Sequence, residues 1–259
     1  MDRWKGRVAV VTGASGGIGA AVARRLVEKG MTVVGLARRE TAMQEMADSL
    51  VDAGAVGKFI PRKCDLALES ELVAAYAWVD STLGGADVIV NNAGLADNSP
   101  LLEASTDVWR MMLDVNVLSL AVSTKLALTS MMARGVDDGH VVNINSLLGH
   151  KVIGNLLPFY TATKWAVTAL CQSFQNELCV RQSHIRVSSI CPGLTRTGLL
   201  PNFEEGKMAA ALDPSDIADA VEYTLAAPSS VIVAEVKLAP NEGTVGHMLA
   251  PVRSLDQTQ

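Results

Sequence analysis

Tyr160 and Lys164 are the residues whose types and spacing most directly suggest chemistry. They stand four positions apart in FYTATKWAV, residues 159–167, a stretch that otherwise has the character of an apolar helix. In a helix, side chains four residues apart lie on one face, with β-carbons about 5–6 Å from each other. A phenol beside an ammonium is a possible acid/base pair, because the ammonium favours the phenolate. The alternative is an exposed tyrosine beside an exposed lysine.

A glycine-rich stretch near the N-terminus has the composition of a phosphate-binding loop. The sequence TGASGGIG places Gly13, Gly17 and Gly19 after a β-rich apolar run and before a helical pattern. Glycines allow a tight turn and a close approach to a pyrophosphate, whose charge is stabilised by free N–H groups at the start of the helix. A plain turn between a strand and a helix is the alternative.

The end of the second β-rich run predicts which dinucleotide binds. An acidic residue about 20 positions beyond the glycines would hold the adenosine ribose 2′-hydroxyl of NAD. The chain instead reads GLARRE, and Arg38 is placed to pair with a 2′-phosphate through its planar guanidinium. Glu40 precedes the next helical segment, where a carboxylate favours the positive end of the helix. The sequence therefore predicts NADP(H), and two solvated arginines are the alternative.

Short apolar runs alternate with helical patterns along the chain. Seven runs have strand character, at residues 7–12, 31–36, 57–62, 87–92, 140–145, 185–190 and 231–238. Helical periodicity covers residues 17–29, 41–53, 68–83 and 158–181. This alternation predicts parallel strands with right-handed crossovers. We therefore expect a single α/β domain over residues 1–259, with a doubly wound, Rossmann-type, mostly parallel seven-stranded sheet between two helical layers.

Composition limits the classes of function. Of the 259 residues, 49% are apolar and 19% charged, which is enough apolar material for a packed core. The net charge is −5 and the lysines and arginines are scattered, which argues against a nucleic-acid surface. The cysteines form no C-x-x-C pair, and the histidines have no ligand spacing, so no metal is expected.

Two segments bear on the compartment of the protein. The N-terminal MDRWKGRVAVVTG lacks the pattern of a signal peptide. Residues 115–133 are the best candidate for a membrane span, but Lys125 at their centre favours a buried or subunit-facing helix. We therefore expect a cytoplasmic protein whose partners are small molecules.

Six motifs together resemble the short-chain dehydrogenase/reductase family. TGASGGIG and YTATK are accompanied by CDL at 64–66, NNAG at 91–94, NINS at 143–146 and CPG at 191–193. Their order and spacing resemble the family over nearly the whole chain. The stretches RWKGRVAVVTGASGGIGAAVA, VDDGHVVNINSLLGHKV and HIRVSSICPGLTRTG look like the branch that contains farnesol dehydrogenases and dehydrogenase/reductase member 11. The resemblance implies NADP(H)-dependent interconversion of an alcohol and its ketone or aldehyde.

The resemblance also implies a catalytic group of four residues, Asn116, Ser146, Tyr160 and Lys164. Ser146 would donate to a substrate carbonyl oxygen, and Tyr160 would exchange a proton with that oxygen. Lys164, together with a positive nicotinamide, would lower the pKa of the phenol and hold the nicotinamide ribose. Asn116 would bind a water that relays protons to Lys164, or would alternatively be a buried asparagine at a helix bend.

Cofactor contacts are expected along most of the motifs. The resemblance implies that Asp65 and Leu66 contact the adenine, that residues 92–94 line the cofactor channel, and that residues 192–197 close over the nicotinamide. The full set is Gly13, Ser15, Gly17, Ile18, Gly19, Arg38, Arg39, Asp65, Leu66, Asn92, Ala93, Gly94, Tyr160, Lys164, Pro192, Gly193, Thr195 and Thr197.

Leucines near the motifs predict an apolar substrate of the farnesol, terpenoid or steroid kind. The positions expected to face it are Leu95, Leu147, Leu148, Ile153, Leu156, Leu199, Leu200 and Phe203, unless these residues only pack the core. Residues 194–213 have the composition of a substrate lid, and residues 240–259 that of an irregular tail.

Two other functions compete with the enzyme. A catalytically silent NADP(H)-sensing protein on the same fold is disfavoured, because all four catalytic positions are present. The second competing function is that of a scaffold subunit, in which helices 106–134 and 158–181 mainly build a symmetric interface. The family often pairs through these helices, so we expect a homodimer or homotetramer.

Overall fold

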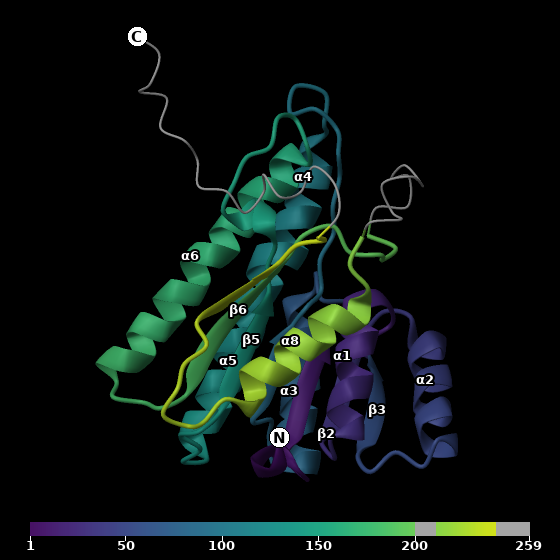
Figure 1. The fold of residues 1–259 in the computed structure, drawn as a ribbon, viewed down its shortest axis with the longest axis vertical. Helices are drawn as coiled ribbons and strands as arrows, with labels where there is room; N and C mark the ends of the chain where they lie inside the picture. Colours follow the sequence, from purple (N-terminus) through teal and green to yellow (C-terminus); the bar gives the residue numbers. More distant parts are fainter. Residues whose placement is uncertain (200–210, 242–259) are drawn as a thin grey trace.

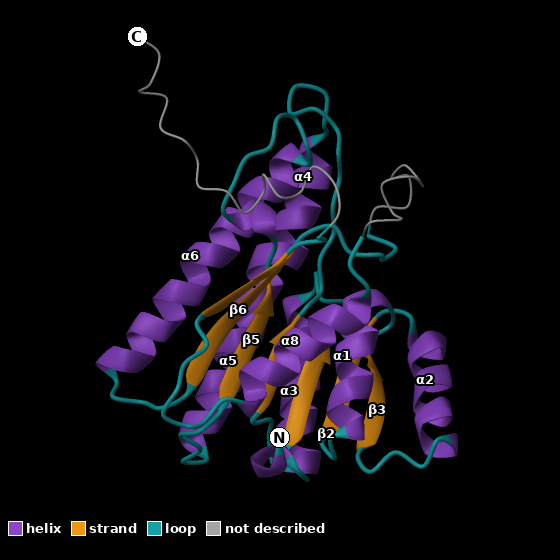
Figure 2. Ribbon diagram, viewed as in Figure 1, coloured by secondary structure: helices purple, strands orange, loops and turns teal. Residues whose placement is uncertain are grey.

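A seven-stranded sheet forms the centre of the protein in the computed structural model, which describes residues 1–199 and 211–241 (Figures 1 and 2). The strands are β1 (Val8–Thr12), β2 (Thr32–Ala37), β3 (Lys58–Lys63), β4 (Val88–Asn91), β5 (His140–Ile144), β6 (Arg186–Pro192) and β7 (Glu235–Leu238). Their order is β3-β2-β1-β4-β5-β6-β7, and each neighbouring pair is parallel. The expected single-domain, doubly wound sheet is confirmed.

Strand β7 is shorter than the sequence predicts. The chain pairs with β6 only from Glu235, whereas residues 231–234 were expected to belong to the strand. The guanidinium of Arg186 donates to the carbonyls of Ala227, Pro228 and Val231, at 3.1–3.4 Å. The carbonyl of Val231, where the predicted strand begins, therefore bonds to a side chain, and backbone bonding to β6 starts at the carbonyl of Ala234.

Two layers of helices cover the sheet. The helical elements are η1 (Asp2–Trp4), α1 (Gly17–Glu28), α2 (Glu40–Asp52), α3 (Glu69–Leu83), α4 (Thr106–Leu113), the π-helical turn η2 (Asp114–Leu118), α5 (Ser119–Ala133), η3 (Leu147–Gly149), α6 (Pro158–Val180) and α8 (Pro214–Ala226). Helices α1, α2 and α8 pack on one face and α3, α5 and α6 on the other (Figure 1). In β1, Ala9 and Val11 enter one core while Val8 and Val10 enter the other. Burial on both faces explains why this strand is apolar throughout.

The strand order reverses between β1 and β4, and the two strand ends are tied together there. The side-chain amide of Asn92 donates to the carbonyl of Thr12 at 2.9 Å. The hydroxyl of Thr12 in turn accepts from the backbone N–H groups of Asn92 and Ala93, at 3.0 and 3.1 Å. A crevice outside this reversal is the usual ligand site of such sheets.

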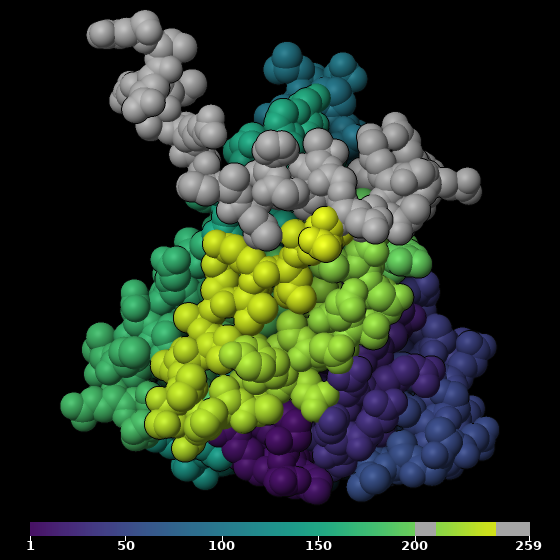
Figure 3. Space-filling model, in the orientation of Figure 1, coloured from purple at the N-terminus to yellow at the C-terminus, as the bar shows by residue number. Residues whose placement is uncertain are grey.

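The two ends of the described chain pack against each other. The indole of Trp4 is fully buried and donates to the carbonyl of Leu225 in α8 at 2.8 Å. In the space-filling view, α8, in light green, lies against the N-terminal segment in purple (Figure 3). The C-terminal helix therefore completes the layer that begins with α1.

One helical stretch in the described residues, Thr106–Ala133, is long and apolar enough to cross a membrane, judged by length and composition alone. Within the domain, 44% of its apolar window is buried. Leu120, Leu128 and Met131 of this stretch belong to the core shared with α3 and α6. These contacts agree with the sequence-based preference for a buried helix.

Candidate active site

A cavity of about 1040 Å³ lies at the carboxyl ends of the central strands. Most residues predicted to bind a cofactor or to act in catalysis line it. These are Gly13, Ser15, Gly17, Ile18, Arg38, Arg39, Asp65, Leu66, Asn92, Ala93, Gly94, Ser146, Tyr160, Lys164, Pro192, Gly193, Thr195 and Thr197. Gly19 and Asn116 do not line the cavity.

The glycine loop has the backbone form that a pyrophosphate requires. Gly13 and Gly17 have φ angles of +69° and +54°, which side-chain-bearing residues rarely adopt. A β-carbon on Gly19 would lie 2.4 Å from the carbonyl oxygen of Gly13, so this glycine allows α1 to pack closely on the loop. The first N–H groups of α1 have no partner within the helix and can bind an anion. The chain therefore fits a dinucleotide at this end of the cavity.

Two arginines border the same end of the cavity. Arg39 donates through Nε to the hydroxyl of Ser15 at 3.2 Å and through Nη2 to its carbonyl at 3.3 Å. The exposed guanidinium of Arg38 has no hydrogen bond or ion pair with residues 1–199 or 211–241. Glu40 is the first residue of α2, one position inside the helix that the sequence predicts to begin at Thr41. The structure thus adds a role for Arg39, which holds the loop that carries Ser15.

Tyr160 and Lys164 share the first turns of α6 and both line the cavity. Their exposed fractions are 6% and 4%, so the alternative of an exposed tyrosine–lysine pair is wrong. The Nζ atom of Lys164 lies 5.5 Å from the centre of the Tyr160 ring and donates to the carbonyl of Ile144 at 2.9 Å. The one-turn spacing therefore brings a phenol and an amine into one buried site, against the end of β5.

Burial dominates the proton affinities of both groups. It raises the pKa of the Tyr160 phenol, and a hydrogen bond with Ser146 acts in the opposite direction. It lowers the pKa of Lys164 to about 8, against the influence of the Cys191 and Cys171 thiols. The expected lowering of the phenol pKa by Lys164 is not found in the chain by itself, because burial disfavours both charged forms.

Ser146 follows β5 and begins the turn η3. Its hydroxyl oxygen accepts from the backbone N–H of Leu148 at 3.1 Å, and its side chain borders the cavity beside Tyr160. A hydroxyl that accepts from the backbone still has its proton to donate. Ser146 is therefore placed to donate to an oxygen in the cavity, as the sequence predicts.

Asn116 lies buried in the π-helical turn η2 and orders its surroundings. Its Oδ1 accepts from the N–H of Leu95 at 2.7 Å, and its Nδ2 donates to the Leu95 carbonyl at 2.8 Å and to the Thr163 hydroxyl at 3.0 Å. These partners match the alternative of a buried asparagine at a helix bend. Its part in a proton relay stays a prediction.

Three positioning residues were missed by the sequence analysis. Thr12 ties β1 to β4, as described above, and Thr163 donates to the carbonyl of Tyr160 at 2.7 Å while it accepts from Asn116. Asn98 accepts from the N–H of Leu157 at 2.8 Å, where Leu157 has a φ of +48° directly before α6. Thr12 and Thr163 stand inside the glycine and YTATK motifs, but Asn98 has no sequence signal because its partner is 59 positions away.

The wall of the cavity near Tyr160 is apolar. Leu95, Leu147, Leu148, Leu156 and Leu199 line it, as predicted. Ile153 packs against the same cluster without lining the cavity, and Leu200 and Phe203 lie outside the described residues. Trp109 and Phe159 stack behind this wall with ring centres 4.8 Å apart. Besides Lys164, the charged residues of the lining are Arg38, Arg39 and Asp65.

The segment predicted as a lid is described only at its ends. Thr195 and Leu212 form an isolated parallel bridge, and the N–H of Arg196 donates to the Leu212 carbonyl at 2.8 Å. Residues 200–210 between them and residues 242–259 of the predicted tail lie outside the described part of the chain. The lid therefore stays a prediction.

Comparison with known proteins agrees with this site. The family model described as short chain dehydrogenase matches residues 7–208. Dehydrogenase/reductase SDR family member 11 of Gallus gallus is 45% identical over 252 residues, covering 93% of this chain and 99% of the relative. Farnesol dehydrogenase of Aedes aegypti is 42% identical over 245 residues, covering 93% and 98%.

Solved structures show the same likeness. A metagenomic short-chain oxidoreductase in complex with NADP has a TM-score of 0.79 at 33% identity, covering 93% of this chain and 99% of that one. A single-residue variant of actinorhodin polyketide ketoreductase with NADPH has a TM-score of 0.80 at 28% identity, covering 91% and 96%. The sheet order, the glycine loop, the Ser146–Tyr160–Lys164 group and these matches together show that the chain belongs to the short-chain dehydrogenase family of oxidoreductases.

Proposed function

We propose that the protein is an NADP(H)-dependent oxidoreductase that interconverts an apolar alcohol and its ketone or aldehyde. The observation that carries this proposal is a single cavity in which the glycine loop lies at one end and Ser146, Tyr160 and Lys164 lie beside an apolar wall. A bound dinucleotide would supply or accept the hydride. The chain binds the dinucleotide and the substrate, orients them, and supplies the proton for the substrate oxygen.

Ser146 and Tyr160 act on the substrate oxygen. During reduction Ser146 donates a hydrogen bond to the carbonyl oxygen, and Tyr160 gives that oxygen its proton. The raised pKa of Tyr160 keeps the phenol protonated at neutral pH, which suits an acid in the direction of reduction. Oxidation needs the phenolate, and a positive nicotinamide near Tyr160 would favour it.

Lys164 acts on its surroundings as a donor. Its Nζ is anchored on the carbonyl of Ile144 at the end of β5 and keeps further N–H donors for a ribose hydroxyl in the cavity. Its pKa of about 8 leaves most of it protonated at pH 7. Lys164 therefore orients the cofactor and stabilises charge on Tyr160.

The preference for the 2′-phosphate is assigned to Arg38. Its guanidinium borders the cavity directly after β2. An acidic residue at this position would favour NAD and repel a phosphate, whereas an arginine can pair with one. The guanidinium of Arg39 already donates to the hydroxyl and the carbonyl of Ser15. Two similar solved structures are complexes with NADP or NADPH, which supports the same choice here.

The substrate is proposed to be apolar and larger than a short aldehyde. Within residues 1–199 and 211–241, the leucine-lined wall has no cation besides Lys164 with which to hold a carboxylate or phosphate near Tyr160. A relative at 42% identity carries the name farnesol dehydrogenase, which supports a prenyl alcohol or a molecule of similar size and polarity.

The test follows NADPH oxidation against aldehydes of increasing chain length, up to farnesal, with steroid and quinone carbonyls beside them. Burying roughly 100 Å² more apolar surface contributes about 2.5 kcal/mol, so kcat/KM should rise by tens of times from a three-carbon aldehyde to a prenyl one. A flat or falling series would contradict the apolar pocket. Tight NADPH binding without turnover of any carbonyl would favour a sensor.

A further inference from the structure

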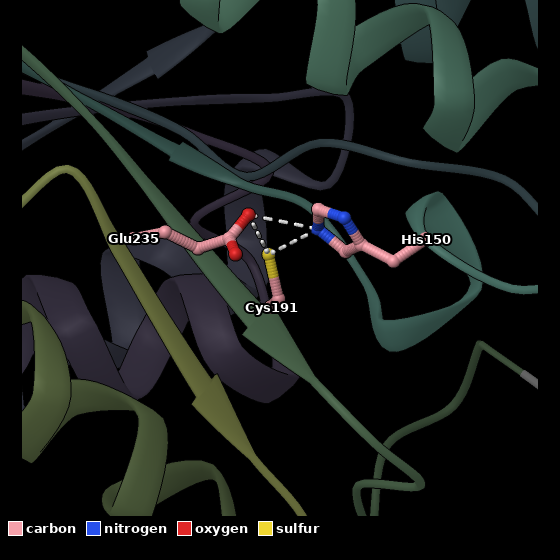
Figure 4. A group of neighbouring side chains, drawn as sticks. All are labelled: His150, Cys191 and Glu235. Atoms are coloured by element: carbon pink, nitrogen blue, oxygen red, sulfur yellow. Dashed lines mark hydrogen bonds and ion pairs between the residues drawn. The ribbon is translucent and has the colours of Figure 1, made fainter. Parts of the chain in front are cut away.

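Three side chains with metal-binding atoms converge beside the cavity without lining it. The Nε2 atom of His150 lies 2.8 Å from Oε2 of Glu235 and 3.4 Å from Sγ of Cys191 (Figure 4). The Cys191 sulfur lies 3.6 Å from the same Glu235 oxygen. His150 follows the turn η3, Cys191 stands in β6, and Glu235 begins β7. Three separate elements therefore bring an imidazole, a thiol and a carboxylate together.

We propose that His150, Cys191 and Glu235 bind a divalent transition-metal ion of the zinc type. Zinc is held by sulfur at about 2.3 Å and by nitrogen or oxygen at about 2.0–2.2 Å, so neighbouring donors of a tetrahedral site lie roughly 3.3–3.6 Å apart. The donor separations of 2.8, 3.4 and 3.6 Å are already within about half an ångström of that range. Only the imidazole and the carboxylate would have to separate to admit the ion.

The sequence predicts no metal, because its cysteines and histidines have no ligand spacing along the chain. His150 and Cys191 stand 41 positions apart and Cys191 and Glu235 stand 44 apart, so no local motif records the group. Strand β7 pairs with β6 in parallel register, which sets Glu235 opposite Ser189, two residues before Cys191 on the same face of the sheet. The order of strands, and not a local pattern, therefore creates the site.

The surroundings allow an ion to enter and help to hold its ligands. Cys191 is fully buried, whereas the side chains of His150 and Glu235 are 20% and 32% exposed at the open edge of the sheet. The hydroxyl of Ser189 lies 3.3 Å from the Cys191 sulfur, and Lys237 pairs with the other oxygen of Glu235 at 2.7 Å. Such outer contacts orient ligands. The Lys237 charge opposes a dication, but its side chain is 41% exposed and therefore screened.

Cysteine binds a metal as the thiolate, so the ion must displace the proton of the Cys191 thiol when it binds.

An ion at this place would connect two segments that border the active site. His150 directly follows η3, the turn that Ser146 begins, and Cys191 directly precedes Pro192 and Gly193 of the cavity wall. A bond through the metal would hold these segments at a fixed separation. We therefore assign the ion the role of joining these two segments beside the cavity, with three protein ligands and a water as the fourth.

The test is a cobalt titration of the metal-free full-length protein without cofactor. Cobalt occupies zinc sites, and a thiolate ligand adds a charge-transfer band to its spectrum. The wild-type protein should bind one equivalent with this band, and Cys191→Ser should lack it. His150→Gln and Glu235→Gln should bind at least about tenfold more weakly, because each loses one ligand. Cys179→Ser is the matched control, since Cys179 is exposed and outside the group.

Thermal unfolding with zinc provides a second readout. At a hundredfold excess over its dissociation constant, a ligand that binds only the folded state should raise the Tm of a chain of this size by roughly 5 °C. Wild type and Cys179→Ser should show this increase, and Cys191→Ser should not. No charge-transfer band in wild type, or an unchanged band in Cys191→Ser, would overturn the proposal. If Cys191→Ser fails to fold, equal cobalt affinity of Glu235→Gln and wild type would overturn it as well.

Discussion

The reactive residues of this protein are buried polar groups in an apolar setting. Tyr160, Lys164 and Ser146 are each less than 10% exposed, and their neighbours are leucines and backbone carbonyls. Burial makes the phenol hard to ionise and the amine easier to neutralise. The site is therefore sensitive to the loss of a single hydroxyl or amine, because water cannot readily replace either group.

Tyr160→Phe should reduce kcat at least about a hundredfold, because the phenol proton is lost while the ring remains. NADPH binding, followed by its fluorescence, should stay near the wild-type value. Tyr76→Phe is a matched control, since Tyr76 is another buried phenol, hydrogen-bonded to Ser123 at 2.7 Å and absent from the cavity lining. Near wild-type turnover by Tyr160→Phe would show that another group carries the proton.

Arg38→Ala should weaken NADPH binding by about ten- to a hundredfold and leave NADH binding almost unchanged. The reason is the loss of a charge-assisted contact worth roughly 1.5–3 kcal/mol to the 2′-phosphate. Arg39→Ala should weaken both cofactors to a similar and smaller extent, because it loosens the Ser15 loop. Dissociation constants for both dinucleotides decide the matter, and an NADPH-selective loss in Arg39→Ala alone would move the assignment to Arg39.

The elements that position these residues begin and end at unusual backbone conformations. Helix α6 starts after Leu157, whose φ of +48° is uncommon for a residue with a branched side chain. The continuous helical stretch from α4 to α5 contains the π-helical turn η2 at Asn116. Such local deviations are often found at functional sites, since they aim a side chain where a regular helix would not.

Asn98→Ala should destabilise the start of α6 and reduce kcat more than it weakens NADPH binding. The substitution removes the acceptor of the Leu157 N–H, and a partly buried hydrogen bond of this kind contributes roughly 0.5–1.5 kcal/mol. Asn98→Asp keeps a carboxylate oxygen in that position and should restore most of the Tm and the activity. If Asn98→Ala matched wild type in both, the hydrogen bond would have no part in placing Tyr160.

At the scale of the whole molecule, two cores on either side of one sheet place the chemistry at a single edge. Polar groups also occur inside these cores. His140 at the start of β5 is fully buried, with Nε2 2.8 Å from the Ser188 hydroxyl and Nδ1 without a partner among the described residues. Burial, with a smaller effect of Arg3, lowers its pKa to about 3.

Stability should therefore fall as the pH decreases from about 6.5 towards 3. In this window the unfolded chain binds a proton at His140 that the folded chain does not, so the free energy of unfolding changes by up to about 1.4 kcal/mol per pH unit. His140→Asn should reduce this slope by close to one proton, as measured by chemical denaturation at several pH values. An unchanged slope would mean that His140 is not the group responsible.

Assembly is the remaining expectation at this scale. Among the described residues, Met111, Leu113, Leu118 and Trp165 are 43–52% exposed on the helical stretch 106–133 and on α6. We propose that these helices pair copies of the chain into a homodimer or homotetramer. Light scattering should show the assembly, and Trp165→Lys should shift it towards smaller species while Val51→Lys on α2 should not. A monomer at micromolar concentration would contradict this.

The sequence by itself determined the elements and the motifs at their ends. Apolar runs and helical periodicity reflect local backbone hydrogen bonding, so the predicted strands and helices begin and end close to the predicted residues, except at the start of β7. The spacing of Tyr160 and Lys164 is equally local, because one helical turn relates them. The cytoplasmic location and the lid stay predictions.

Only the tertiary structure decided which distant groups meet. It placed Asn116 against Leu95 and Thr163. It also brought Arg39, rather than Arg38, into hydrogen-bonding contact with Ser15. It also decided that burial raises the pKa of the Tyr160 phenol, where the sequence predicts a lowering by Lys164. Contacts of this kind depend on strand order and on the packing of side chains in three dimensions. The meeting of His150, Cys191 and Glu235 is one more case, since a parallel pairing of two strands creates it and no spacing along the chain records it.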